Sequence, residues 1–253
     1  MKQISKYLFT AFVVAALAAT TGGIVLTVIF VSQISNFTIS RSIASRLVTL
    51  RQAAGLPEEG EYYYTSDILT SDVFTASAFD ISMREINPDY VCWIMIYGTN
   101  VDYPVVRASD NERYLNTSFL GERNRYGTLF MDYRNTGEFV PHIIIYGHNT
   151  QDGSKFGTLH NFLDDEFLAN HPVITLKVND RIVEYEIFSA RLTDINDPAY
   201  FLDFSAPGSF RAFLERNGAP PDAVQILTLS TCVGRVIDDN RLVVQGALRL
   251  NGS

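Results

Sequence analysis

From residue 85 onward, the sequence consists of short apolar runs separated by turn-forming residues. Runs of this length, rich in β-branched and aromatic side chains, predict strands, and many of them at close spacing predict an all-β barrel or sandwich. The second run contains Pro104, which is typical of an edge or irregular strand. The expected strands are Tyr90–Tyr97, Val101–Val106, Thr128–Met131, His142–Tyr146, Val173–Val178, Ile182–Thr193, Val224–Thr231 and Leu242–Leu250.

Helical segments are expected between and before these strands. Residues 36–55 have apolar side chains at helical spacing and end at a Gly-Leu-Pro sequence. Residues 57–80 are polar, acidic and rich in tyrosine, which indicates a linker or a loosely packed helix. The inserts expected to be helical are Asn111–Phe119, Thr158–Leu168 and Ser209–Arg216, the last with Phe210, Phe213 and Leu214 on one face.

The N-terminal region carries an uncharged apolar run from Tyr7 to Val31, long enough to cross a bilayer as a helix. Lys2 and Lys6 precede the run and the next basic residue is Arg41, so the positive-inside rule predicts a cytoplasmic N-terminus. A cleaved signal peptide is the alternative, because residues 16–18 resemble a cleavage site, but the apolar run continues well beyond them. We therefore expect a single-pass membrane protein with a cytoplasmic segment 1–6, an anchor 7–31, an extracytoplasmic helical or linker region 32–84 and an extracellular main domain 85–253.

Charge and cysteine usage exclude some classes of function. The net charge is -8 and the basic residues form no cluster, which argues against nucleic acid as a partner. Two cysteines, Cys92 and Cys232, are too few for a disulfide framework, and could form one bridge or remain free thiols. No CxxC pair or His-rich tract suggests zinc, so we expect neither a metal nor a cofactor.

Three polar residues lie at the ends of apolar runs. His148 follows a strand that stops at Gly147, Cys232 directly follows the run Val224–Thr231, and Arg241 opens the run Leu242–Leu250. If the last two runs form a hairpin, Cys232 and Arg241 lie at the same end of it. An imidazole or a cation makes a thiolate available, the imidazole can protonate a leaving amine, and a guanidinium can stabilise an oxyanion.

Each of these residues also has a purely structural interpretation. Cys232 could be a small buried hydrophobe, His148 a loop residue, and Arg241 a surface charge paired with a neighbouring aspartate. We interpret Cys92, inside an apolar run, as a core residue. The other histidines, which we also assign to structure, are His142, His160 and His171.

The sequence around the three polar residues resembles the sortase family. Residues 228–232, TLSTC, resemble its TLxTC signature, and the contexts IIIYGHN of His148 and DDNRLVVQGAL of Arg241 match in order and approximate spacing. The resemblance covers roughly residues 85–250, and points to class B through the segments 87–106, 110–122, 126–135 and 152–159 and the insert near 197–217.

This resemblance implies a closed or nearly closed sortase-type β-barrel and a cysteine transpeptidase. It would cleave an NPxTN-like C-terminal sorting signal of secreted proteins through a thioester, and transfer them to an amine of a peptidoglycan precursor or a pilin. Carried over by position, Cys232 is the nucleophile, His148 the acid/base and Arg241 the stabiliser. The positions that would line the peptide groove are Asn111, Leu115, Ser230 and Thr231.

Two other functions remain in competition. A papain-like wall peptidase would have its cysteine before its histidine in the sequence, the reverse of the order here. A catalytically inactive, membrane-anchored peptide-binding module would keep the groove without the chemistry. In one departure from the family, Cys92 stands where glycine is common, and a regulatory disulfide with Cys232 would require the two to be close.

Overall fold

The computed structural model describes residue 49 and residues 78–136, 140–179, 181–233 and 239–249. The expected membrane anchor at 7–31 and, apart from Thr49, the expected helix at 36–55 lie outside these ranges. Within the described ranges, no helix combines the length and the hydrophobicity needed to span a membrane. The described residues all belong to one compact unit, Leu47–Ser253.

Strands make up most of the described regular structure. The strands are β1 (Tyr90–Met95), β2 (Asp102–Val106), β3 (Leu129–Met131), β4 (His142–Tyr146), β5 (Val173–Val178), β6 (Arg181–Asp194), β7 (Ala223–Cys232) and β8 (Asn240–Arg249). The helices are α2 (Ala78–Ile86), α3 (Asp165–Asn170) and α4 (Ser209–Asn217), with the 3-10 turns η1 (Arg113–Leu115), η2 (Leu159–Leu163) and η3 (Pro198–Tyr200).

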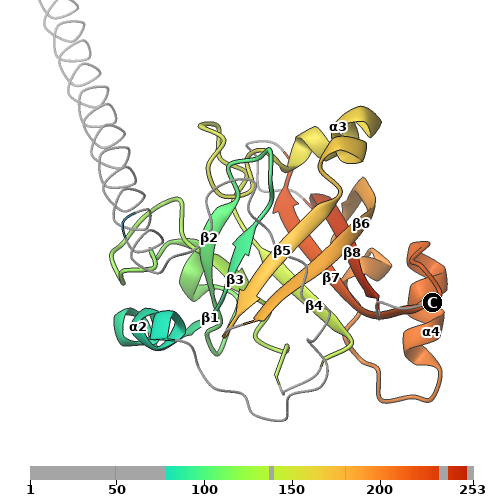
Figure 1. The fold of residues 1–253 in the computed structure, drawn as a ribbon, viewed down its shortest axis with the longest axis horizontal. Helices are drawn as coiled ribbons and strands as arrows, with labels where there is room; N and C mark the ends of the chain where they lie inside the picture. Colours follow the sequence, from blue (N-terminus) through green and yellow to red (C-terminus); the bar gives the residue numbers. More distant parts are fainter. Residues whose placement is uncertain (1–48, 50–77, 137–139, 180, 234–238, 250–253) are drawn as a thin grey trace, which may run out of the picture. The chain divides into compact units, whose positions relative to one another are not determined.

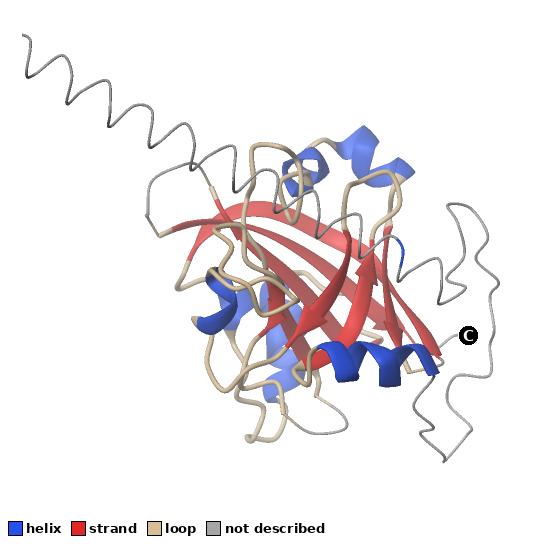
Figure 2. Ribbon diagram, turned by 90° about the vertical axis from the view of Figure 1, so that its left-hand side faces the viewer, coloured by secondary structure: helices blue, strands red, loops and turns tan. Residues whose placement is uncertain are grey.

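The strands close into a barrel in the order β1-β2-β3-β4-β7-β8-β6-β5 (Figures 1 and 2). β4 runs parallel to β7, and β8 runs antiparallel to β7. The ends of β4 and β7 therefore meet the start of β8 at one end of the barrel. The helix α3 lies at one end of the barrel and α2 toward the other (Figures 1 and 2).

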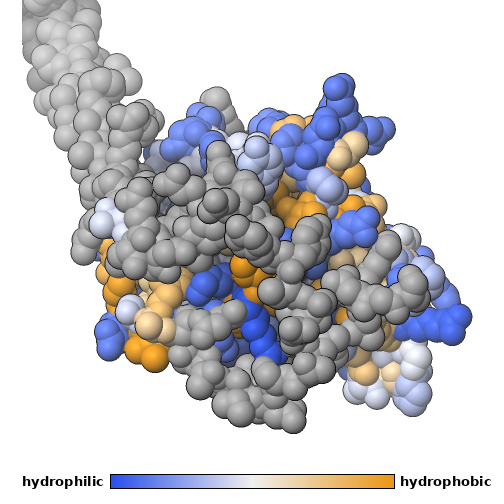
Figure 3. Space-filling view, viewed as in Figure 1, coloured by the Kyte–Doolittle hydropathy of each residue, from blue (hydrophilic) through white to orange (hydrophobic). Residues whose placement is uncertain are grey.

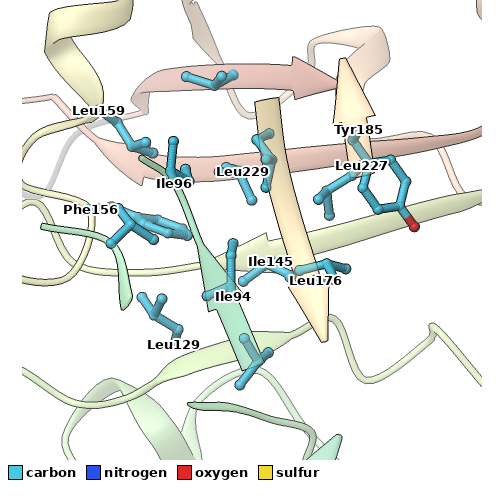
Figure 4. Packing of buried hydrophobic residues seen from close by; sticks show 14 of the residues in the cluster. Ile94, Ile96, Leu129, Ile145, Phe156, Leu159, Leu176, Tyr185, Leu227 and Leu229 are labelled. Atoms are coloured by element: carbon cyan, nitrogen blue, oxygen red, sulfur yellow. The ribbon is translucent and has the colours of Figure 1, made fainter. Parts of the chain in front are cut away.

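The barrel interior is filled by alternate residues of the strands. Ile94, Leu129, Ile145, Leu227 and Leu229 come from different parts of the wall and are all 0% exposed (Figure 4). Burying one such side chain contributes about 1.5–3 kcal/mol. Because alternate residues of a strand face opposite sides, the residues between these core positions face outward from the barrel.

A second apolar cluster covers part of the outer wall. Phe213 and Leu214 of α4 pack against Ile226 of β7 and Ala247 of β8. The expected apolar face of this helix is confirmed, since Phe210 also packs against the cluster. The insert between β6 and β7 is thereby fixed against the outside of β7 and β8.

The helix α2 presents a buried carboxylate to the barrel. Asp80 is 0% exposed and lies 3.5 Å from the Nζ of Lys177 on β5. On the solvent side, Ile81 and Ile86 are 48% and 38% exposed, and Figure 3 shows apolar surface over α2. The surface over α3 is mostly polar in the same view.

The prediction of strands is confirmed, with shifts of one or two residues at their ends. Pro104 is accommodated because β2 pairs with β3 only at Val105 and Val106. The expected helix at 111–119 is wrong except for the turn η1. There, the Asp110 side chain accepts the backbone N–H groups of Glu112 and Arg113, which favours a turn over a continuing helix.

Candidate active site

The strand register brings the three predicted catalytic residues into one row. Cys232 pairs directly with Arg241 across β7 and β8, which confirms the expected hairpin. Tyr146 pairs with Ser230 across the parallel strands β4 and β7, and the N–H of Gly147 donates to the carbonyl of Ser230 at 3.2 Å. Continuing this register by two residues places His148 opposite Cys232.

All three side chains lie on the outward face of the barrel wall. Leu229 and Leu242 belong to the interior cluster, so Cys232 and Arg241 face outward by alternation. The same alternation applies to His148, three residues after the inward-facing Ile145. Cys232 is exposed, whereas His148 and Arg241 are partly exposed. The thiol is thus open to a substrate while its neighbours are held by the wall.

Hydrogen bonds to backbone carbonyls hold this end of the three strands together. The Nδ2 of Asn149 donates to the carbonyl of Cys232 at 3.1 Å, which joins the segment after β4 to the end of β7. The N–H of Val233 donates to the carbonyl of Asn240 at 3.3 Å, and this carbonyl also accepts from the Nη1 of Arg241 at 2.9 Å. The main-chain positions of Cys232 and Arg241 are therefore fixed relative to the segment that carries His148.

His148 is oriented by a backbone carbonyl. Its Nε2 lies 2.7 Å from the oxygen of Leu115. A carbonyl oxygen can only accept a hydrogen bond, so Nε2 carries a proton whether the ring is neutral or charged. Nδ1 is therefore the nitrogen that can take up or release a proton. In many cysteine and serine enzymes a third side chain orients the catalytic histidine, and here the main-chain carbonyl of Leu115 takes that place.

The residues predicted to line the peptide groove have different environments. Leu115 is 36% exposed and contributes the carbonyl that holds His148. Ser230 is buried, and its Oγ lies 2.8 Å from the hydroxyl of Tyr200. Thr231 is buried on the inward face, opposite to Cys232, and its hydroxyl has no hydrogen-bond partner among the described residues.

Asn111, the fourth predicted groove residue, is part of a polar cluster around Asp132. Its Nδ2 donates to Asp132 at 3.1 Å, and its Oδ1 accepts the N–H of Tyr133 at 3.0 Å. The hydroxyl of Tyr146 donates to Asp132 at 2.9 Å, and Arg134 forms a bidentate ion pair with it. Burial alone would raise the pKa of Asp132, but these hydrogen bonds together lower it.

Sequence reasoning missed two tyrosines that border the site. Tyr146 precedes His148 by two residues on the outward face of β4, and Tyr200 contacts Ser230 from the insert after β6. Burial raises the pKa of Tyr200, whereas its hydrogen bond with Ser230 and the positive charge of Arg241 oppose the rise. Alternation along β4 could have identified Tyr146, but nothing in the local sequence indicated Tyr200.

The second cysteine is separate from the site. Cys92 is 1% exposed within the barrel core, as predicted, and both cysteines are free. Burial raises the pKa of the Cys92 thiol well above its usual range. Among the described residues, no group of three or more His, Cys, Asp or Glu side chains is arranged to hold a metal ion.

Comparisons with known proteins agree with the closed β-barrel. A family model described as the sortase domain matches residues 94–249. Sortase B of Listeria monocytogenes is 32% identical over 203 residues, which covers 76% of this chain and 82% of the relative. The chain belongs to the sortase family, and its similarity to Sortase B proteins supports class B.

Solved structures of Staphylococcus aureus sortase B share the fold. One crystal structure has a TM-score of 0.66 at 26% identity and covers 81% of this chain and 97% of that chain. A sortase B–substrate complex from the same organism has a TM-score of 0.62 at 29% identity and covers 68% of this chain and 85% of that chain.

Proposed function

We propose that this chain is a cysteine transpeptidase that acts on the C-terminal sorting signal of secreted proteins. The observation that carries the proposal is that Cys232 pairs with Arg241 across β7 and β8, while His148 follows the neighbouring strand β4 by two residues. Membership of the sortase family supports it, since the family consists of such enzymes.

In the first half of the reaction, the Cys232 sulfur attacks the carbonyl carbon of a threonine in the signal. The resulting oxyanion is stabilised by the guanidinium of Arg241, the residue that pairs with Cys232 across β7 and β8. The carbon–nitrogen bond then breaks, and the imidazolium of His148 gives its Nδ1 proton to the leaving amine. The product is a thioester between Cys232 and the threonine.

In the second half, an amine attacks the thioester carbonyl. His148, now neutral, accepts a proton from the amine at Nδ1, and the carbon–sulfur bond breaks to regenerate the Cys232 thiolate. The contact of Nε2 with the Leu115 carbonyl keeps the ring in one orientation through both halves. The new product is an amide between the secreted protein and the acceptor.

The partners follow from the resemblance to class B sortases. The signal would be NPxTN-like, and the acceptor an amine of a peptidoglycan precursor or of a pilin. A relative of known structure is described as a sortase B–substrate complex, which supports a peptide ligand for this site. The uncharged run 7–31 would anchor the chain in the cell membrane, with residues 1–6 in the cytoplasm and 32–253 outside.

The test uses the full chain in mild detergent with a fluorogenic NPxTN-type peptide, with and without an amine acceptor. We expect cleavage that the amine accelerates, a new amide product, and loss of both in Cys232→Ala. No cleavage across a panel of sorting signals, together with slow alkylation of Cys232, would favour the inactive peptide-binding module.

A further inference from the structure

A largely buried ion pair lies at the base of the insert between β6 and β7. The Nη2 of Arg191 is 2.6 Å from Asp197, and the two side chains are only 29% and 13% exposed. The guanidinium of Arg191 also donates to Ser189 at 3.0 Å, Gln245 at 2.6 Å and Asn217 at 3.0 Å. It thus connects the insert with β6, β8 and α4.

Asp197 organises the turn η3 from this position. Its Oδ1 accepts the backbone N–H of Ala199 at 2.7 Å, and its carbonyl accepts that of Tyr200 at 3.0 Å. The hydroxyl of Thr193 also donates to its carboxylate. Burial alone would raise the pKa of Asp197, but the hydrogen bonds from Arg191 and Thr193 lower it. The carboxylate therefore stays charged and caps the turn.

Tyr200, the last residue of η3, lies next to the active site. The Tyr200 hydroxyl lies 2.8 Å from the Oγ of Ser230, which is two residues before Cys232 on the same outward face of β7. Arg241 pairs with Cys232 across β7 and β8, so the Tyr200 hydroxyl lies in the neighbourhood of the predicted catalytic residues.

A second series of hydrogen bonds connects Arg191 with Phe201, the residue that follows Tyr200. Gln245 accepts from Arg191 and donates to the Thr228 hydroxyl at 3.0 Å. Thr228 lies 2.8 Å from the Nε2 of His142, whose Nδ1 lies 2.8 Å from the carbonyl of Phe201. That carbonyl only accepts, so Nδ1 is the donor, and the neutral Nε2 accepts from Thr228. Each donor in this series is thus matched to one acceptor.

We propose that Arg191 and Asp197 are positioning residues for the reaction. Their ion pair holds the turn η3 and with it Tyr200, which contacts Ser230 near Cys232 and forms a wall that orients the peptide. This inference rests on the function proposed above. Because the pair acts through Tyr200, its loss is expected to weaken substrate binding and orientation while the reactivity of the thiol is preserved.

The experiment is a double-mutant cycle in the full chain, with Asp197→Ala, Tyr200→Phe and their combination. Glu215→Ala is the matched control, because this carboxylate of the same insert forms an exposed ion pair, 3.4 Å from Arg211, in which the side chains of Arg211 and Glu215 are 85% and 70% exposed. Asp197→Asn is a milder variant, which keeps the size of the side chain and an acceptor for the capped N–H. It is expected to recover part of the activity.

Three quantities are measured for each protein. They are kcat and KM for the NPxTN-type peptide, the rate of Cys232 alkylation by iodoacetamide, and hydrogen exchange of the amides of residues 199–201. We expect Asp197→Ala and Tyr200→Phe each to lower kcat/KM on the order of 10- to 100-fold, mainly through KM. The double variant should be no worse than the poorer single variant. Amide exchange should accelerate in Asp197→Ala, and Glu215→Ala should match the wild type.

Several results would overturn the proposal. Unchanged kcat/KM in Asp197→Ala, losses that multiply in the double variant, or an alkylation rate that falls in parallel with turnover would each do so. If the wild-type chain cleaves no peptide, the proposed function fails, and amide exchange alone decides the positioning role. Faster exchange at residues 199–201 in Asp197→Ala, but not in Glu215→Ala, would then uphold that role, and unchanged exchange would refute it.

Discussion

His142 provides a quantitative test of how the outer wall is built. It is 1% exposed, and each ring nitrogen has a hydrogen-bond partner that suits the neutral ring. Burial lowers the pKa of His142 from 6.5 to about 4, although the Phe201 carbonyl and the negative charge of Asp132 oppose this effect. We therefore predict that His142 makes the folded chain sensitive to acid.

The size of the effect follows from proton linkage. In the unfolded chain, His142 takes up a proton as the pH falls through its ordinary pKa, whereas the folded chain resists protonation until the pH approaches 4. Between these values the unfolded state binds more protons, so stability falls as the pH falls. The slope is about 1.4 kcal/mol per pH unit, or roughly 3 kcal/mol over the whole window.

The assay compares urea unfolding of the wild type and His142→Gln in the same detergent between about pH 7 and pH 4.5. The variant is less stable at neutral pH because it loses the matched hydrogen bonds. However, the difference between the two free energies of unfolding should shrink by about 1.4 kcal/mol for each unit of acidification below about pH 6.5. A difference that stays constant across this range would refute a buried, neutral His142.

Three further outcomes are expected. Replacing Arg241 by Ala or by Lys should abolish most turnover with an unchanged circular dichroism spectrum, because Ala has no cation and the ammonium of Lys cannot replace the guanidinium fork. Near-normal rates in these variants would contradict the stabiliser role. Iodoacetamide should alkylate Cys232 far faster than the buried Cys92, and His148→Ala should lower the alkylation rate of Cys232 alone. Mass spectrometry of the digested peptides measures both rates. Asp132→Ala removes the acceptor of four side-chain hydrogen bonds and should cost roughly 2–3 kcal/mol in urea unfolding, whereas a loss below about 0.5 kcal/mol would contradict its role.

The barrel could be predicted because its strands have a strong local signal. Runs such as Val173–Val178 are short, apolar and bounded by turn residues, and each one corresponds to an observed strand. The helix α2 is not predicted, although Phe79, Met83 and Ile86 have helical spacing, because its first residues continue the polar stretch before it. The order of the strands does not follow from local patterns, since β4 and β7 are parallel neighbours far apart in the sequence.

The candidate site could be predicted only in part, because some of its contacts join segments that are far apart in the sequence. Cys232 and Arg241 are joined by a hairpin, so their pairing followed from local spacing. The contact of His148 with a main-chain carbonyl leaves no trace in the side-chain pattern. Likewise, the approach of Tyr200 to Ser230 depends on how the insert folds back onto the barrel, which involves contacts between residues far apart in the sequence.

The central claim is that Cys232 forms a covalent acyl intermediate, and mass spectrometry of the full chain tests it most directly. The protein is mixed with an NPxTN-type peptide without an amine acceptor, quenched in acid and digested. We predict an adduct with the mass of the peptide up to its threonine, located on Cys232, labile to hydroxylamine and absent from Cys232→Ala. An unmodified Cys232 under conditions in which the peptide is cleaved, or an adduct on another residue, would contradict the account.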